Sequence, residues 1–326
     1  MMNQRDIIAV GGSWGAVDAV NRLFRGLPGD LPATLLITLH IGAQGRDLLA
    51  ELFAEGASIT ASTAKDGDEL RSGHAYVAPA DRHLLLIDGV VRLGRGPREN
   101  MSRPAIDPLL RSVGVCCGHR AIGVILTGML NDGASGLADL KKCGGLTVVQ
   151  NPADALAADM PWEALQSSEV DYRAPLSDLP ALLVELCGQK AGPPAEVPVD
   201  IASEVEIALG SARTAILPEG ISEVTALTCP ACNGVLSQIK REPPLRYRCQ
   251  VGHAYTAEAL AAQQEGSVDE ALRVALRIME ERVRLTGSML GDAKRSGRKA
   301  AAISYQTRLT ESRTYADILR QAIEKI

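Results

Sequence analysis

The segment Ile7–Gly15 reads IIAVGGSWG, an aliphatic run that ends in a glycine-rich turn. The run predicts a buried strand, and the residues after the turn, through Arg25, have the apolar spacing of a helix. The same order returns at Thr34–Leu39, a second aliphatic run, which is followed by helical spacing over Arg46–Glu55. Strands that alternate with helices indicate a parallel sheet covered by helices on both faces.

The alternation continues further along the chain, with short strands between its two halves. Strand, helix and strand are expected at Ala121–Leu126, Gly133–Lys142 and Leu146–Gln150. The intervening short strands are expected at His74–Ala78, His83–Ile87 and Val90–Leu93, the last two joined by a tight turn at Asp88-Gly89. We therefore predict an α/β fold built on a doubly wound, mainly parallel, Rossmann-like sheet.

Composition limits the class of protein. Apolar residues make up 46% of the 326 residues and aromatic residues only 3%, so the core is expected to be aliphatic. The net charge of -5 argues against a nucleic-acid binder, which usually carries a basic surface. We find no signal peptide and no apolar run of about 18 residues, which predicts no membrane insertion. Seven cysteines, three of them in a metal-like spacing, favour a reducing cytoplasm over a disulfide framework.

Changes in composition divide the chain into four predicted segments. Residues 1–188 hold the alternating strands and helices, and residues 189–224 are a linker rich in proline and small residues. Residues 225–262 hold a cysteine and histidine cluster, and residues 267–326 are helical throughout. Within this C-terminal segment, a pair of apolar stripes, interrupted at Gly291, Ser296 and Gly297, predicts a helical hairpin or a coiled-coil pair.

Gly11-Gly12-Ser13-Trp14-Gly15 matches G-x-S-x-G at a strand-to-helix turn, the arrangement that exposes a nucleophilic serine. The alternative is a glycine-rich turn that only closes a strand–helix unit. A dinucleotide site fits poorly, because Ser13 and Ala16 stand where G-x-G-x-x-G has its second and third glycines. A Walker phosphate loop is excluded here, since no Gly-Lys-Ser/Thr follows.

A nucleophilic serine needs a base and an acid that orients the base. His40 ends the second aliphatic strand, and neighbouring strand ends in a doubly wound sheet bring His40 and Ser13 to the same edge. Asp132 follows the strand Ala121–Leu126 and is the candidate for the orienting acid. The alternatives are a packed structural histidine and an aspartate that only caps a helix.

These residues carry a resemblance to a known family. The matching segments are IIAVGGSWG at 7–15, the strand end Thr38-Leu39-His40, HAYVAP at 74–79, Arg103-Pro104 with Asp107, GVILTGMLNDGA at 123–134, Gln150-Asn151, and Met160-Pro161. In this order and spacing they resemble the catalytic domain of the chemotaxis methylesterase CheB over roughly residues 5–187.

The resemblance implies hydrolysis of γ-glutamyl methyl esters on methyl-accepting receptors, and deamidation of receptor glutamines. It implies Ser13 as nucleophile, His40 as base and Asp132 as orienting acid, with the backbone N–H of Met129 in the oxyanion hole. The chain departs from the family where Trp14-Gly15-Ala16 follows the serine, which puts an indole at the mouth of the site. The first strand begins so early that no receiver domain is expected before it, so regulation by phosphorylation in cis is not expected.

The cysteine cluster has the pattern C-x2-C-x16-C-x3-H, formed by Cys229, Cys232, Cys249 and His253. Three thiolates and an imidazole are a four-ligand set suited to tetrahedral, structural zinc. The alternatives are a metal-free relic and a redox pair, and the redox pair would leave Cys249 and His253 unexplained. No cofactor is expected for the hydrolysis itself.

The leading hypothesis is therefore a cytoplasmic serine hydrolase that demethylates glutamate methyl esters on chemotaxis receptors. A second enzyme hypothesis keeps the triad and changes the substrate to a glutamine amide. The contrasting hypothesis is a non-catalytic adaptor of a signalling complex, which binds partners through the zinc module and the helical tail. The C-terminal helices could also join copies of the chain into a homo-oligomer.

Overall fold

The computed structural model describes residues 4–40, 48–211, 220–240 and 244–325. The chain divides into two compact units, Met1–Leu260 and Ala261–Ile326. The predicted helix start at Arg46 lies outside the described residues, and the helix itself is described from Leu49.

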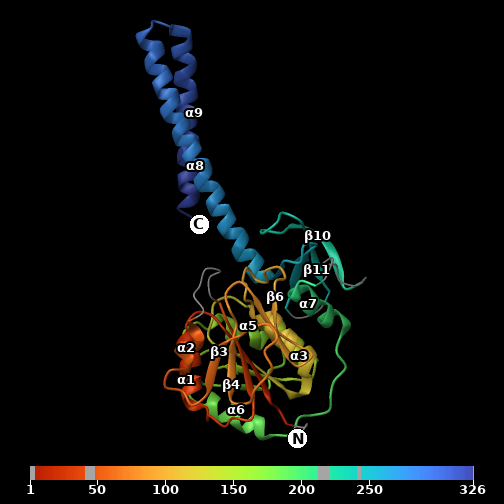
Figure 1. Ribbon diagram of the computed structural model, residues 1–326. Coiled ribbons are helices and arrows are strands. Elements are labelled where there is room, and N and C mark those ends of the chain that lie inside the picture. Colours follow the sequence, from red (N-terminus) through yellow and green to blue (C-terminus); the bar gives the residue numbers. More distant parts are fainter. Residues whose placement is uncertain (1–3, 41–47, 212–219, 241–243, 326) are drawn as a thin grey trace. The chain divides into compact units, whose positions relative to one another are not determined.

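A seven-stranded sheet forms the centre of the first unit (Figure 1). Every pairing in it is parallel, in the order β3-β4-β2-β1-β7-β8-β9. The strands are β1 (Ile7–Gly12), β2 (Thr34–Leu39), β3 (Thr60–Thr63), β4 (His74–Val77), β7 (Ala121–Ile125), β8 (Leu146–Gln150) and β9 (Tyr172–Ala174). The prediction of a doubly wound, mainly parallel sheet is confirmed.

Helices cover both faces of this sheet, because the central strands bury side chains on both. On β1, Ile8 and Val10 point into one core while Ile7 and Ala9 point into the other. The first core is completed by α1 (Ala16–Gly26), α2 (Leu49–Ala54) and α6 (Leu179–Gly188). The second is completed by α3 (Ile106–Cys117), α4 (Ala134–Lys142) and α5 (Asp159–Ser167).

A two-stranded hairpin of β5 (His83–Ile87) and β6 (Val90–Gly94) packs on α3. Asp88 and Gly89 both have positive φ, of 52° and 76°, as a tight two-residue hairpin turn requires. A short 3₁₀ turn, η1 (Gly118–Arg120), leads from α3 into β7.

The rest of the first unit is a helix and a small antiparallel sheet. α7 (Val199–Leu209) lies within the predicted linker and contacts α3, β5 and β6. The sheet has the order β10-β11-β12-β13, with β10 (Ser222–Thr228), β11 (Val235–Ile239), β12 (Arg246–Cys249) and β13 (Ala254–Thr256). Its core holds Cys229, Leu236, Cys249, Tyr255 and Leu260. We call residues 225–260 the cysteine module.

The second unit consists of two long helices that run side by side in opposite directions (Figure 1). They are α8 (Ala257–Arg295), whose first turn belongs to the first unit, and α9 (Lys299–Ile323). The predicted break at Gly291 is wrong, because this glycine lies inside α8, and the chain turns at Gly297 with φ of 67°. Within the described ranges, no helix combines the length and the apolar character needed to cross a bilayer.

Candidate active site

The candidate site lies at the carboxyl edge of the sheet, where β2, β1 and β7 end side by side. Ser13 follows β1, His40 follows β2, and Asp132 lies in the loop between β7 and α4. Adjacent parallel strands bring these three loops to one place, as expected for a doubly wound sheet.

Two hydrogen bonds join the three side chains in series. His40 Nδ1 lies 3.1 Å from Ser13 Oγ, and His40 Nε2 lies 2.7 Å from Asp132 Oδ2. An ionised carboxylate only accepts hydrogen bonds, so Nε2 carries the proton and Nδ1 faces the serine as a hydrogen-bond acceptor. The three residues singled out from the sequence are therefore in contact, in the order that nucleophilic catalysis needs.

The backbone around Ser13 packs so closely against its neighbours that two positions there have no space for a side chain. A Cβ at Gly11 would lie 2.1 Å from Cγ2 of Ile106, and one at Gly12 would lie 2.6 Å from Cβ of Ala16. Gly15 has φ of 81° and is where the chain turns into α1. The tight turn leaves the side chain of Ser13 partly exposed.

Asp132 has lost almost all contact with water, yet it stays ionised. Burial opposes its charge, but the hydrogen bond and charge of His40 and the N–H of Ile106 outweigh burial and lower the pKa of Asp132. Oδ2 accepts the N–H of Ile106 at 2.7 Å, at the start of α3, so Asp132 caps that helix and not its own. Burial and the charge of Asp132 raise the pKa of the neighbouring Asp107 to about 7.

Thr127–Leu130 form one wall beside the serine. The N–H of Ser13 donates to the carbonyl oxygen of Thr127 at 3.0 Å, and a Cβ at Gly128 would lie 3.0 Å from Cβ of Ser13. Met129 and Trp14 are 55% and 64% exposed, and the N–H groups of both find no acceptor among the described residues. Trp14 thus extends into solvent next to a serine that remains partly accessible.

A family model described as CheB methylesterase matches residues 8–183. The chain belongs to this family. The match covers the central sheet from β1 to β9, and with it Ser13, His40 and Asp132.

Relatives and a solved structure agree with the family. A protein-glutamate methylesterase/protein-glutamine glutaminase of Pectobacterium atrosepticum is 41% identical over 175 residues, which are 52% of this chain and 50% of the relative. One of Anaeromyxobacter dehalogenans is 36% identical over 181 residues, 56% of this chain and 53% of the relative. The crystal structure of the Thermotoga maritima CheB methylesterase catalytic domain matches with a TM-score of 0.53 and 30% identity, covering 56% of this chain and 98% of that domain. The chain spans about half the length of the curated relatives it matches.

One polar residue of this CheB-type site was not foreseen. The amide Nδ2 of Asn100 donates to Asp132 Oδ1 and to Asp107 Oδ2, each at 3.0 Å. Asn100 lies in the loop before α3, outside any periodic pattern, and its remaining side-chain partner is Thr256, far along the chain. No sequence signal links these positions.

His74 and His83, the two histidines that begin strands β4 and β5, have local hydrogen-bond partners. The ring nitrogens of His74 lie 2.7 Å from the hydroxyls of Thr60 and Ser62 on β3. Nε2 of His83 donates to the carbonyl of Pro97 at 2.9 Å. Both contacts fit structural roles away from the candidate triad.

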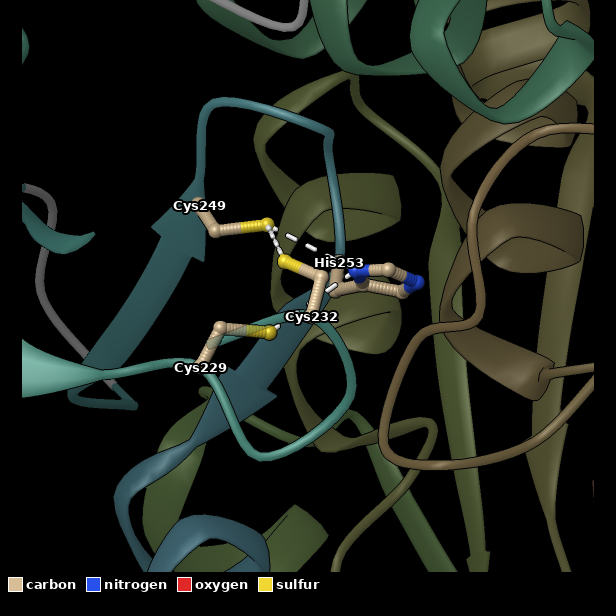
Figure 2. A group of neighbouring side chains, drawn as sticks. All are labelled: Cys229, Cys232, Cys249 and His253. Atoms are coloured by element: carbon tan, nitrogen blue, oxygen red, sulfur yellow. Dashed lines mark hydrogen bonds between the residues drawn. The ribbon is translucent and has the colours of Figure 1, made fainter. Parts of the chain in front are cut away.

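Beyond the CheB match, Cys229, Cys232, Cys249 and His253 converge in the cysteine module (Figure 2), with ligand atoms within 4.8 Å of one another. Cys232 Sγ and Cys249 Sγ are 3.7 Å apart, and Nδ1 of His253 lies 3.5 Å from Sγ of Cys249. Tetrahedral zinc, with bonds of about 2.3 Å to sulfur and about 2.0 Å to nitrogen, requires separations of roughly 3.5–3.8 Å. The donor set fits this ion, and the two separations given fall in that range.

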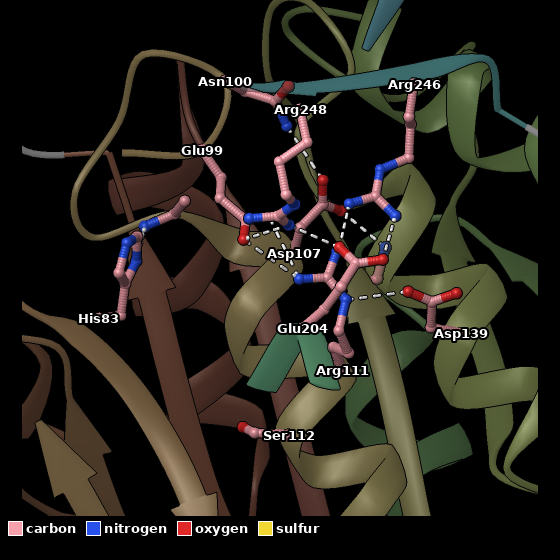
Figure 3. Close-up of polar contacts among 12 residues, drawn as sticks. His83, Glu99, Asn100, Asp107, Arg111, Ser112, Asp139, Glu204, Arg246 and Arg248 are labelled. Carbon is pink, nitrogen blue, oxygen red and sulfur yellow. Dashed lines mark hydrogen bonds and ion pairs between the residues drawn. The ribbon is translucent and has the colours of Figure 1, made fainter. Parts of the chain in front are cut away.

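The cysteine module is joined to the CheB domain by a buried ionic network (Figure 3). Glu204 of α7 is bound by both guanidinium nitrogens of Arg246 and by Arg248 at 2.6 Å. Arg111 of α3 binds Glu99 at 3.1 Å and Asp139 at 3.0 Å, and lies 3.5 Å from Glu204. Three arginines thus balance three carboxylates, all fully or almost fully buried.

Proposed function

We propose that this protein is a serine hydrolase that removes methyl groups from glutamate methyl esters on methyl-accepting chemotaxis receptors. The observation that carries the proposal is the unbroken chain from Ser13 Oγ through the His40 ring to Asp132. The relatives, protein-glutamate methylesterase/protein-glutamine glutaminases, support the same substrate class and add a protein glutamine as a second substrate.

In the proposed mechanism Ser13 Oγ attacks the ester carbonyl while His40 Nδ1 takes its proton. The protonated ring then gives this proton to the departing methoxide, which leaves as methanol. Water, deprotonated by the same nitrogen, attacks the acyl-enzyme; the bond to Ser13 Oγ breaks, Oγ takes the proton back from the ring, and glutamate is released. Asp132 holds Nε2–H throughout and stabilises the imidazolium, which is why its carboxylate must remain ionised.

The tetrahedral intermediate needs hydrogen-bond donors for its oxyanion. The N–H of Trp14, at the residue after the nucleophile, and the N–H of Met129 are the proposed donors. Both lack an acceptor among the described residues, and both flank Ser13. The exposed side chains of Trp14, Met129 and Trp162 would form an apolar rim against which a receptor segment packs.

Methanol release from purified methylated receptors tests the proposal. The wild type should release methanol, Ser13→Ala should release none, and Ser177→Ala, which removes an exposed hydroxyl elsewhere, should match the wild type. Ammonia release from unmodified receptors measures the glutaminase activity separately. The adaptor hypothesis is not favoured. It would be supported if a phosphonofluoridate probe labelled neither the wild type nor Ser13→Ala.

We further propose that the cysteine module binds one structural zinc ion. Four protein ligands would leave no coordination position for a substrate, so the metal would stabilise the fold. All seven cysteines are without disulfides, which suits a thiolate site in a reducing cytoplasm. Gently purified protein should contain about one equivalent of zinc, and Cys232→Ser should lower that content.

A second copy of the chain is the proposed partner of the helical tail. Val274, Ile278 and Leu285 of α8, with Ile303 and Ile318 of α9, are exposed apolar side chains on the second unit. Pairing of two tails would bury them. Sedimentation equilibrium should detect a dimer that Ile278→Lys weakens, and a monomer at all concentrations would contradict the proposal.

A further inference from the structure

The carboxylate of Asp132 is held from two sides. Oδ2 accepts hydrogen bonds from His40 and from the N–H of Ile106, both at 2.7 Å. Oδ1 accepts the amide of Asn100 at 3.0 Å and, within the described part of the chain, otherwise only the N–H of Asp107 at the longer distance of 3.3 Å. Asn100 is therefore the side chain that fixes the rotation of this carboxylate relative to His40.

The orientation of Asn100 depends on the cysteine module. Its Oδ1 accepts the backbone N–H of Thr256 at 3.0 Å, which directs Nδ2 toward Asp132. Its backbone N–H donates to the carbonyl of Ala254 at 2.9 Å, and the N–H of Ala254 donates to the carbonyl of Arg98 at 3.3 Å. Strand β13 thus pairs with the loop that carries Asn100.

That loop needs such support because its backbone is strained. Asn100 and Met101 have φ of 47° and 64°, in the left-handed region that non-glycine residues seldom adopt. Such conformations persist where surrounding contacts impose them. Beside them the carboxylate of Glu99, 1% exposed, is bound by Arg248 of β12 and by Arg111 of α3, each at 3.1 Å.

The same strand reaches the catalytic loop by a second route. The hydroxyl of Thr256 donates to Asn131 Oδ1 at 2.6 Å, and Asn131 Nδ2 donates to Glu258 at 2.7 Å. Asn131 is fully buried and immediately precedes Asp132. Residues 254–258 therefore hold both the residue before Asp132 and the amide that contacts it.

The position of this segment follows from the metal ligands. Thr256 lies three residues after His253, and β12 ends at Cys249. The hydrophobic cluster at the cysteines holds five buried residues, two of which are cysteines of the metal-ligand set. A core this small is not expected to hold its shape without the metal, because metal binding supplies folding free energy in such modules.

Resting on the proposed hydrolase function, we infer that the cysteine module is a positioning element of the active site, which makes methyl ester hydrolysis dependent on its metal. Metal binding orders β13, and β13 orients Asn100 and Asn131. These two amides hold the Asp132 carboxylate in the position where it bonds to His40. Asn100 and Asn131 are positioning residues, since neither reaches the serine.

Asn100→Gly removes the amide and leaves a residue for which φ of 47° carries no strain. The variant loses the side-chain hydrogen bonds to Asp132, Asp107 and Thr256. Loss of the one to the buried charge of Asp132 should lower kcat about tenfold to hundredfold with KM within about twofold. Zinc content should stay at one equivalent, and the d–d absorption of cobalt-substituted protein should be unchanged. Asp88→Gly, at a left-handed turn of the β5–β6 hairpin, is the matched control and should match the wild type.

Metal removal supplies the test of coupling. Chelation of the wild type should lower kcat by a factor similar to Asn100→Gly, and chelation of Asn100→Gly should cost at most about twofold more, because both act on the same contact. If the losses of kcat from chelation and from Asn100→Gly multiplied, the metal would act through another contact and the inference would fail. Full activity of the zinc-free wild type or of Asn100→Gly would also overturn the inference.

Two smaller substitutions at Thr256 test the inference in case Asn100→Gly does not fold. Thr256→Val removes the hydroxyl that binds Asn131 and should lower kcat, and Thr256→Ser, which restores it, should recover most of the loss. If no methanol is released by the wild type, the proposed function fails on its own. The inference is then judged by the rate of phosphonofluoridate labelling of Ser13, which should fall in Asn100→Gly and on chelation, and equal rates would refute it.

Discussion

At the scale of single residues, His83 is a neutral imidazole enclosed by backbone. Its Nε2 donates to the carbonyl of Pro97, and its Nδ1 accepts the N–H of Ala105. Burial lowers the pKa of His83 from 6.5, so in acid the unfolded chain binds a proton here that the folded chain does not. Stability from this group is present above pH 6.5 and is lost as the pH falls below it.

Urea unfolding at pH 7.5 and 5.5 measures this effect. Between these values the wild type should lose up to about 1.4 kcal/mol more unfolding free energy than His83→Gln. Other titrating groups, including Asp107, are common to both proteins and cancel in the difference. Equal losses in the two proteins would show that His83 accepts a proton in the folded state.

Asp132→Asn tests the acid without changing its shape. An amide nitrogen facing Nε2 would force the other tautomer of His40, which puts a proton on Nδ1 and leaves no base for Ser13. We expect kcat to fall about a thousandfold or more. Methanol release measures it, and circular dichroism checks that the fold is retained. A fall of less than tenfold would mean that His40 does not depend on this carboxylate.

Sequence reasoning named Ser13, His40 and Asp132 because each follows an aliphatic strand, and strand ends of a parallel sheet meet. The structure brings their side chains into contact. Sequence reasoning could not name Asn100, because its partners Asp132 and Thr256 lie 32 and 156 positions away in the chain. An isolated polar residue in a loop looks the same whether or not a distant strand binds it.

At the scale of elements, the central strands were predictable and the edges were not. β1 and β2 are buried at every position, so they read as continuous aliphatic runs. β3 and β9 lie at the two edges, are short and partly exposed, and lack that pattern. α3 was also missed; it is buried nearly all round, and its buried face includes the polar side chains Asp107, Arg111 and Ser112.

The buried ionic network predicts a large effect from one substitution. Arg111→Met would leave Glu99 and Asp139 without their bonds to its guanidinium. Breaking a buried ion pair from one side costs about 3–5 kcal/mol, because an uncompensated charge remains. Urea unfolding of the full chain measures the loss. Arg92→Met, which breaks an exposed pair with Asp66, should cost under about 1 kcal/mol. Similar losses in both variants would mean that the buried charges find other partners.

At the scale of the whole molecule, the two units differ in how they hold together. The first has two aliphatic cores around a sheet and a third, small core at the cysteines. In the second, few of the described side chains are buried between the helices: Thr286, Leu290, Ala293, Leu309, Ser312 and Ala316. The sequence indicated helices here from periodicity alone, and it could not say how many residues they bury.

The two units should therefore unfold in separate transitions, and metal removal should affect one of them. Both tryptophans, Trp14 and Trp162, belong to the first unit, so their fluorescence reports only its unfolding. Circular dichroism at about 222 nm reports the helices of both. A ligand that binds only the folded state stabilises it by mass action, and the proposed zinc site lies in the first unit. Chelation should lower the fluorescence midpoint by several degrees and leave the transition of the tail helices in place, visible only by circular dichroism. Coincident transitions by both probes, shifted equally by chelator, would mean that the units unfold as one cooperative body.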